Sequence, residues 1–158
     1  MQDQTIKDFK PLVIEKTANT PQIELDNLTG NLIFSGRSIP ENAANLYEPI
    51  LNWVTKYLPE ARPTTNLRIN LEYFNTSSVL WLSKIFRILI RINKPNHTLI
   101  VHLYMPVDDY NEITEFEDII DAFGPIEDVL HTTLSNIGIK LHGINTNNEI
   151  IKETLVFI

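Results

Sequence analysis

The sequence contains no cysteine. Disulfides, thiolate metal sites and cysteine nucleophiles are therefore excluded, and a cysteine-free chain is compatible with a reducing compartment. The five glycines are scattered, and the chain contains no GxxxxGK[ST], GxGxxG or GxSxG motif of phosphate loops and hydrolase elbows. No apolar run approaches the roughly 20 residues of a membrane span, and the first residues lack the apolar core of a signal peptide. We therefore expect a soluble, cytoplasmic protein with no membrane partner.

Basic residues are in the minority, since 13 Lys and Arg stand against 20 Asp and Glu, for a formal net charge of −7. Nucleic-acid binding relies on clustered Lys and Arg, so we expect no nucleic-acid partner. Acidic residues gather between positions 95 and 139, where no Lys or Arg occurs: Asp108, Asp109, Glu112, Glu115, Glu117, Asp118, Asp121, Glu127 and Asp128. Such a block is typical of a solvated helix surface or of a docking surface.

The hydrophobic pattern predicts one α/β domain. Pro21 to Gly36 has the alternation of a β-hairpin around a turn that contains Gly30. The following elements are a helix, a strand, a second helix and a second strand, expected over Glu41–Leu58, Leu67–Phe74, Ser77–Asn93 and His97–Met105. The strand–helix–strand order implies a parallel pair with a right-handed crossover.

The C-terminal third has a weaker pattern. It predicts an acidic helix over Asn111–Phe123, a further helix over Pro125–Asn136 and a strand over Ile137–Ile144, whereas the tail from Glu149 receives no assignment. The expected fold is a single α/β domain, with a mixed four- to five-stranded sheet opened by a β-hairpin and packed against three to four helices. We expect residues 1–19 to be an N-terminal arm that could be mobile, residues 20–145 to form the domain, and residues 146–158 to be a C-terminal extension.

Few residues suggest catalysis. The four histidines show no HExxH spacing, and the one combination that suggests a metal or hydrolase centre is His102 with Asp108 or Asp109. Adjacent aspartates belong far more often to turns and helix starts than to catalytic pairs. We therefore predict no catalytic residue, metal site or cofactor, and a protein that is not an enzyme.

The stretch NTSS, from Asn75 to Ser78, follows a predicted strand and begins a predicted helix. Asn, Ser and Thr side chains cap helices, and one cap needs only one of them. The carboxyl end of a strand in an α/β sheet is also where ligands and reactive groups gather, and a phosphate there would meet free N–H groups and the positive end of the helix dipole. The stretch is thus a helix cap, a phosphoryl site, or both.

The helix after NTSS has basic residues at spacings of three and four: Lys84, Arg87, Arg91 and Lys94. At about 100° per residue they share an arc of roughly 80°, which includes Thr76 and Ser77 when continued toward the N-terminus. This face is either a solvated surface opposite the core or a partner-docking face with the hydroxyls at one end. Trp81, on the same helix, is either a core residue or part of that docking face.

Three motifs occur in order, namely SxPEN at Ser38–Asn42, WxxxYL at Trp53–Leu58 and NTSS at Asn75–Ser78. In this combination the sequence resembles the SiaC-type regulatory phosphoproteins, small bacterial domains similar in architecture to anti-sigma-factor antagonists (the STAS fold). The resemblance covers about residues 18–110 well and the remainder loosely.

This resemblance implies a switch. Thr76 is the implied phosphorylation site, with a Ser/Thr kinase of the histidine-kinase-like type and a PP2C-type phosphatase as partners. The unphosphorylated form is implied to bind and activate a diguanylate cyclase, which raises cyclic-di-GMP. The residues expected at the partner surface are Asn75, Ser77, Ser78, Lys84, Arg87 and Arg91. Two alternatives remain: a ligand-sensing STAS-like module with a small-molecule pocket near Thr76, and the hydrolase that uses Asp108 or Asp109.

Overall fold

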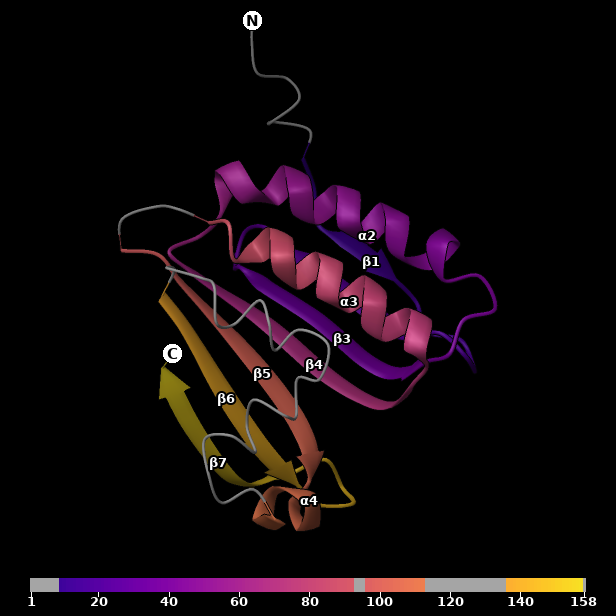
Figure 1. Cartoon of the computed structure of the whole chain (residues 1–158), viewed down its shortest axis with the longest axis vertical. Coiled ribbons are helices and arrows are strands. Elements are labelled where there is room, and N and C mark those ends of the chain that lie inside the picture. The colour runs from indigo at the N-terminus through magenta and orange to yellow at the C-terminus, as the bar shows by residue number, and fades with distance from the viewer. Residues whose placement is uncertain (1–8, 93–95, 113–135, 158) are drawn as a thin grey trace, which may run out of the picture.

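The structure, a computed structural model, describes residues 9–92, 96–112 and 136–157. Seven strands of this part of the chain form one sheet in the order of the sequence (Figure 1). The strands are β1 (Leu12–Ile14), β2 (Gln22–Asp26), β3 (Asn31–Ser38), β4 (Thr64–Phe74), β5 (Thr98–Pro106), β6 (Asn136–Ile144) and β7 (Ile150–Phe157). The helices are α2 (Ala43–Tyr57), α3 (Thr76–Leu89) and α4 (Val107–Glu112), with a short 3-10 turn at Leu58–Glu60.

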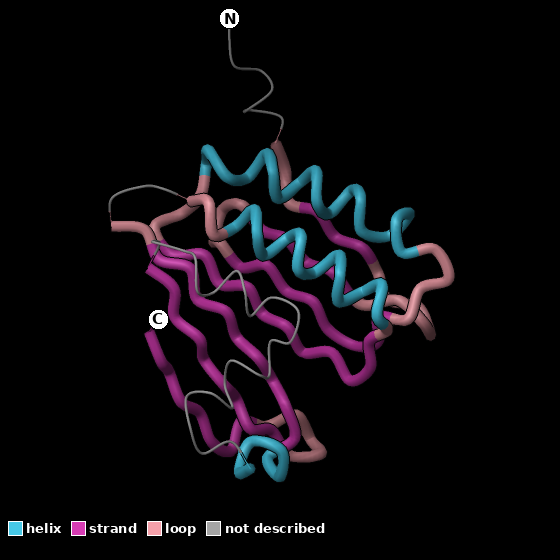
Figure 2. The backbone as a smooth tube through the Cα atoms, in the orientation of Figure 1, coloured by secondary structure: helices cyan, strands magenta, loops and turns pink. Residues whose placement is uncertain are grey.

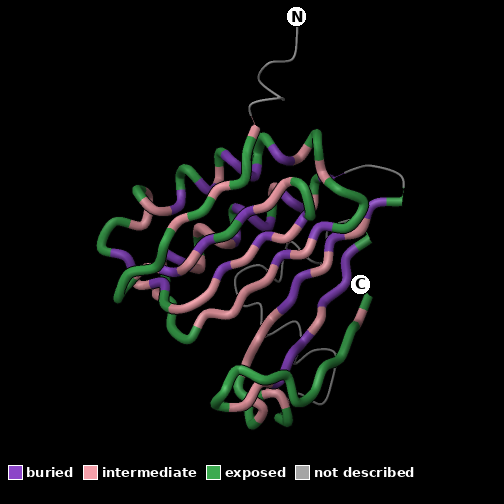
Figure 3. Tube along the Cα trace, turned by 180° about the vertical axis from the view of Figure 1, so that it is seen from behind, coloured by how far each residue is buried: buried purple, intermediate pink, exposed green. Residues whose placement is uncertain are grey.

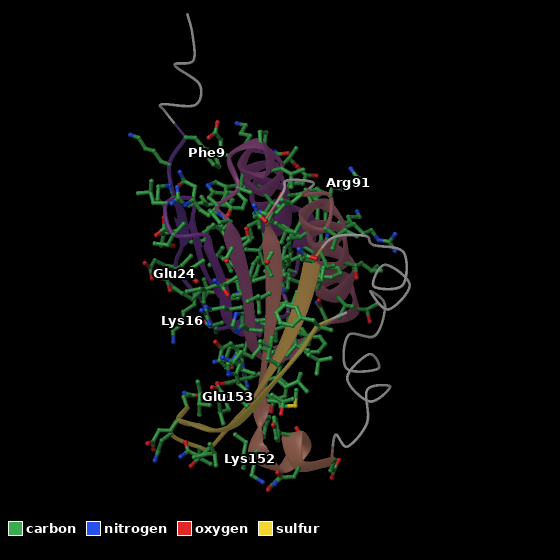
Figure 4. The ribbon with its side chains drawn as sticks, turned by 90° about the vertical axis from the view of Figure 1, so that its left-hand side faces the viewer. Phe9, Lys16, Glu24, Arg91, Lys152 and Glu153 are labelled. Carbon is green, nitrogen blue, oxygen red and sulfur yellow. The ribbon has the colours of Figure 1, made fainter. Side chains whose placement is uncertain are left out.

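The sheet is mixed. Strands β1, β2 and β3 pair antiparallel, β3 to β6 run parallel, and β7 returns antiparallel to β6. The predicted hairpin and the predicted parallel strand–helix–strand unit are both confirmed. Helices α2 and α3 lie side by side on one face of the sheet, and the side view shows both on the same side of the strands (Figures 2 and 4).

The predicted strand count of four to five was too low. The two strands that the sequence pattern did not reveal are β1 and β7, which lie in the segments predicted as an arm and an extension. Strand β1 has three residues, too few to show a period, and nearly every residue of β7 is exposed, so that it shows no alternation. The Phe9 ring also packs at 5.0 Å from Trp53, whose indole N–H donates to the Lys10 carbonyl.

The hydrophobic core lies between the sheet and helices α2 and α3 (Figure 3). Its sheet side consists of alternate residues of the central strands, such as Phe34, Leu67 and Val101. Its helix side includes Ile50 and Phe86. Burying an aliphatic or aromatic side chain stabilises the fold by about 1.5–3 kcal/mol each. This core fixes the position of α3, at whose start the NTSS stretch lies.

Both ends of α2 and the start of α3 differ from the prediction by one or two residues, whereas α3 ends at Leu89, four residues before the predicted end at Asn93. Helix α2 begins at Ala43, because the Asn42 side chain accepts the Asn45 N–H and makes Asn42 the N-cap. Helix α3 begins at Thr76. The helix predicted from Asn111 lies almost wholly outside the described residues, and the one predicted over Pro125–Asn136 lies there apart from Asn136, which opens β6. The predicted strand Ile137–Ile144 is confirmed as β6. None of the helices in the described ranges is long and apolar enough to cross a membrane.

Gly30 closes the β2–β3 turn with φ = 81°, in the left-handed region that glycine tolerates. A Cβ at this position would lie 2.5 Å from the Thr64 carbonyl oxygen at the start of β4, a backbone atom that cannot move aside. We therefore expect Gly30→Ala to lower the free energy of unfolding by at least about 1 kcal/mol. Urea denaturation measures this change. The matched control is Gly36→Ala, which also has a positive φ, of 102°, but meets no atom within 4 Å. Equal losses for the two variants would contradict the role of the Thr64 contact.

Candidate functional site

The NTSS stretch directly follows the end of β4 at Phe74 and forms the N-cap and first turn of α3. The Asn75 N–H donates to the Ser38 carbonyl at 3.0 Å, which ties the end of β4 to the end of β3. The Asn75 side-chain oxygen then accepts the Ser78 backbone N–H at 2.9 Å and the Ser77 hydroxyl at 3.0 Å. Asn75 is therefore the N-cap of α3. The sequence left open which side chain of NTSS caps the helix, and the structure assigns this role to Asn75.

Ser78 points into a buried cluster of hydroxyls beneath the helix start. The Ser78 oxygen lies 2.7 Å from the Ser38 hydroxyl, which lies 2.6 Å from the Tyr47 hydroxyl on α2. All three residues are fully buried. Burial raises the pKa of the Tyr47 phenol although the hydrogen bonds to Ser38 and Ser78 lower it, so the hydroxyl stays protonated at neutral pH. The cluster joins β3, α2 and α3 at one point and fixes the start of α3.

Thr76, in contrast, is exposed. It is the first residue of α3, where backbone N–H groups lack partners within the helix. Three apolar side chains near it in the chain are also more than half exposed: Tyr73 at 58%, Phe74 at 55% and Leu80 at 53%. Exposed apolar groups beside polar ones are typical of a surface that binds another protein.

An open groove of about 330 Å³ follows α3 from this point, lined by Ser77, Leu80, Trp81, Ser83, Lys84 and Arg87. The Lys84 ammonium lies 4.3 Å from the centre of the Trp81 ring, and that ring stacks on Tyr47 at 6.2 Å. Trp81 thus meets both expectations, because it packs against the core and lines the groove. Thr76 does not line the groove itself, but it directly precedes Ser77, which does, and around the helix axis it lies roughly 40° from Leu80.

The family model described as "SiaC family regulatory phosphoprotein" matches residues 14–131. This chain belongs to the SiaC family. The matched range includes β2 to β5, both long helices and the NTSS stretch. The resemblance seen in the sequence is therefore confirmed.

Solved structures show the same fold. Apo-SiaC from Pseudomonas aeruginosa superposes with a TM-score of 0.63 at 23% identity, over 82% of this chain and 98% of that one. SiaC in the crystal structure of the diguanylate cyclase SiaD with its activator SiaC, from the same organism, gives a TM-score of 0.64 at 23% identity, over 83% and 99% of the two chains. A further SiaC structure from this organism is 26% identical with a TM-score of 0.57, over 68% and 93%.

A curated relative is an uncharacterized protein of Pseudomonas aeruginosa strain UCBPP-PA14, 37% identical over 68 residues. The match covers 43% of this chain and 54% of the relative, so the chain spans about half the length of the curated relative it matches.

The structure of this SiaC-family protein brings together some of the predicted partner-binding residues but not all. Lys84 and Arg87 are exposed and line the groove, and the partly buried Ser77 lines it as well. Arg91 is exposed but lies beyond Leu89, where α3 ends, as its position in Figure 4 shows. Lys94 lies outside the described residues.

Two of the residues predicted at the partner surface have a structural role in this fold. The Ser78 side chain is fully buried in the hydroxyl cluster, and the Asn75 oxygen is occupied as the cap of α3. Sequence reasoning also missed Ser38 as the partner of Ser78, 40 residues away. The only signal was its place in the SxPEN motif, which gave no hint of a contact with NTSS.

The residues of the hydrolase alternative do not meet. His102 lies on the face of the sheet opposite α2 and α3, where its ring nitrogens contact Asn66 at 2.8 Å and His142 at 2.9 Å. Asp108 and Asp109 are exposed on α4, beyond the end of β5, and neither contacts His102. Within the described residues no group of three or more His, Asp or Glu side chains is placed to hold a metal ion.

Proposed function

We propose that Thr76 accepts a regulatory phosphate and that the unphosphorylated protein binds a diguanylate cyclase through the α3 groove. The observation that supports this most directly is the exposed Thr76 hydroxyl at the edge of the groove, within a family of regulatory phosphoproteins. SiaC of Pseudomonas aeruginosa is the activator of the cyclase SiaD and forms a complex with it. The protein would therefore act in the cytoplasm on cyclic-di-GMP synthesis, without catalysing a reaction itself.

The groove suits an amphipathic segment of a partner. Leu80 and Trp81 offer apolar surface, while Lys84 and Arg87 offer positive charge to acidic side chains. No ion pair within the described residues involves Lys84 or Arg87, and the Lys84 ammonium lies over the Trp81 ring. A helix with apolar residues along one stripe and acidic residues beside it has the required chemistry.

Phosphorylation would act locally. A phosphothreonine has about −1.5 to −2 charges at neutral pH and lies close to free N–H groups of the first turn of α3, so the fold can hold it. An interface that covers Thr76 would then have to bury this charge, at a cost of several kcal/mol unless a cation pairs with it. The partner would dissociate without any refolding of the switch protein. We propose that a kinase of the histidine-kinase-like type and a PP2C-type phosphatase set the phosphorylation state.

Intact-mass spectrometry after co-expression with a Ser/Thr kinase of the histidine-kinase-like type tests the modified residue. We expect the mass of one phosphate on the wild-type protein, its loss in Thr76→Ala and its retention in the matched control Ser77→Ala. The control is stringent because Ser77 is the adjacent hydroxyl and is not fully buried. A phosphate that persists in Thr76→Ala, or that maps to Ser77, would refute the proposal.

The α3 groove keeps one alternative open, a small molecule bound beside Thr76. A ligand that occupies the groove would raise the melting temperature of the protein in proportion to the logarithm of its excess concentration. Thermal scans with nucleotides and cyclic dinucleotides test this directly. A saturable rise that is lost in Trp81→Ala would favour a ligand sensor over a protein-docking groove.

A further inference from the structure

Strand β7 ends the sheet on the side away from β1, and its outer edge has no neighbour among the described residues (Figure 1). It is eight residues long, and its chain trace is almost entirely exposed (Figure 3). Four of its apolar side chains are about half exposed or more: Ile150 at 51%, Ile151 at 52%, Leu155 at 45% and Phe157 at 62%. The edge therefore combines free backbone groups with apolar surface.

Soluble proteins normally protect such an edge. They shorten it, place Pro in it, twist it away with a bulge or add several charges. The opposite edge, β1, follows this rule with three residues. Strand β7 has no Pro, its one irregularity in pairing lies at the Ile150 end, and it has one Lys and one Glu. An unprotected edge of this length is typical of a strand that pairs with another chain.

The sequence of β7 fits a second copy of itself. An antiparallel pair about a two-fold axis places one residue opposite its own copy, and that residue defines the register. The middle of β7 lies between Glu153 and Thr154, so nearly full overlap requires one of these two at the centre. A centre at Glu153 would place two carboxylates opposite each other, which is unfavourable. A centre at Thr154 places Glu153 opposite Leu155, and Lys152 opposite Val156.

The charges of β7 do not oppose this register. The Glu153 carboxylate is already engaged toward β6, 3.0 Å from the His142 ring and 3.7 Å from the Lys140 ammonium. The Lys152 ammonium donates to the Asn111 side chain at 2.9 Å. The Thr154-centred register also places the exposed Ile151 of one copy opposite Phe157 of the other. Because of the two-fold symmetry this contact occurs at both ends of the pair, and each one would bury apolar surface.

We propose that this protein forms a two-fold dimer in which β7 pairs antiparallel with β7 of a second copy, with Thr154 opposite Thr154. The two sheets then form one continuous sheet of both chains. The interface lies at the far edge of the sheet from α2, and the α3 groove stays open in both copies (Figure 1). A dimer of this kind would present two partner-binding grooves.

The absence of cysteine makes the register directly testable. In the proposed dimer the two Thr154 Cα atoms are about 4.5–5.5 Å apart, within the range of a disulfide. The two Leu155 Cα atoms are offset by two residues and lie about 8 Å apart, outside that range. Under mild oxidation we expect Thr154→Cys to form a covalent dimer and the matched control Leu155→Cys to remain largely monomeric on non-reducing gels. Equal cross-linking of both variants, or none of Thr154→Cys, would overturn the proposed register.

Light scattering coupled to gel filtration tests the dimer without a cross-link. We expect the wild-type mass to rise from one chain to two between low micromolar and millimolar concentrations. Leu155→Glu places a carboxylate opposite Glu153 of the other copy and should raise the dissociation constant of the dimer at least tenfold. Leu155→Lys places a cation there and should keep the dimer. Within its own chain position 155 lies opposite Lys140, so Leu155→Glu places its carboxylate near a cation, and circular dichroism checks that both variants stay folded. A wild-type monomer at every concentration, or a dimer equally strong in Leu155→Glu, would overturn the proposal.

Discussion

Phosphorylation of Thr76 is expected to weaken binding of the partner cyclase by about 100-fold or more. Thr76 is exposed and directly precedes Ser77, which lines the groove, so we expect a partner that fills the groove to cover the Thr76 hydroxyl. Burying an unpaired charge costs about 3–5 kcal/mol, and each 1.4 kcal/mol is about tenfold in affinity. Isothermal titration of the cyclase with separated phosphorylated and unphosphorylated protein measures the difference. Thr76→Ala should bind like the unphosphorylated form, because loss of a methyl and a hydroxyl at an exposed position changes little.

Two variants separate the effect of an added negative charge on affinity from the effect of its position. Thr76→Asp has one negative charge in place of nearly two, so its affinity should lie between those of the phosphorylated and unphosphorylated proteins. Thr55→Asp is the matched control, because it adds the same charge at an exposed Thr of the neighbouring helix α2. We expect its affinity to remain that of the wild type. Equal affinity of the phosphorylated and unphosphorylated proteins would show that the partner does not cover Thr76.

The second large effect is a loss of stability in mild acid, caused by His102. Burial, with the charges of Arg68, His142 and Lys140 around it, lowers the pKa of His102 to about 3. The unfolded chain has the ordinary value near 6.5, so it binds this proton before the folded protein does. The stabilising contribution is fully present above about pH 6.5 and is lost as the pH falls toward 3. We expect the free energy of unfolding to fall by about 1–2 kcal/mol between about pH 7 and pH 5 from this residue.

The neighbouring His142 acts in the same direction. Burial lowers its pKa, although the Glu153 carboxylate at 3.0 Å opposes the shift. Urea denaturation across this pH range measures the slope of stability for the wild type and for His102→Gln. The slope should decrease in the single variant and decrease further in His102→Gln with His142→Gln. An unchanged slope in the double variant would show that other groups cause the acid sensitivity.

The parts of the candidate site that depend on contacts between near neighbours in the chain were predictable from the sequence. The NTSS stretch at the end of an alternating strand indicated a helix start, and Asn75 and Ser78 lie three residues apart in that start. The basic residues Lys84 and Arg87 followed from helical spacing, and both line the groove. Arg91 was misplaced because periodicity does not show where a helix ends. Ser78 was misplaced because a small hydroxyl carries no sign of burial in its own sequence.

The contacts that the sequence did not reveal are long-range. Ser38, Tyr47 and Ser78 come from three elements and meet only after the sheet and helices have packed. The pair of stacked histidines, His102 and His142, forms because β5 and β6 are neighbours in the sheet. No spacing along the chain predicts such encounters, since tertiary packing alone decides which strands lie side by side.

By itself, the sequence determined an α/β domain, its hairpin and parallel crossover, the SiaC-type motifs and the position of Thr76 at a helix start. These follow from hydrophobic period, turn residues and capping chemistry, all of which act between near neighbours in the chain. Only the tertiary structure decided which hydroxyl of NTSS is exposed and which is buried, that a groove begins at Ser77 beside Thr76, and that the tail forms β7 as the last strand of the sheet. Those properties depend on which surfaces are covered by other elements. A strand that is exposed on both faces has no hydrophobic period from which it could be predicted.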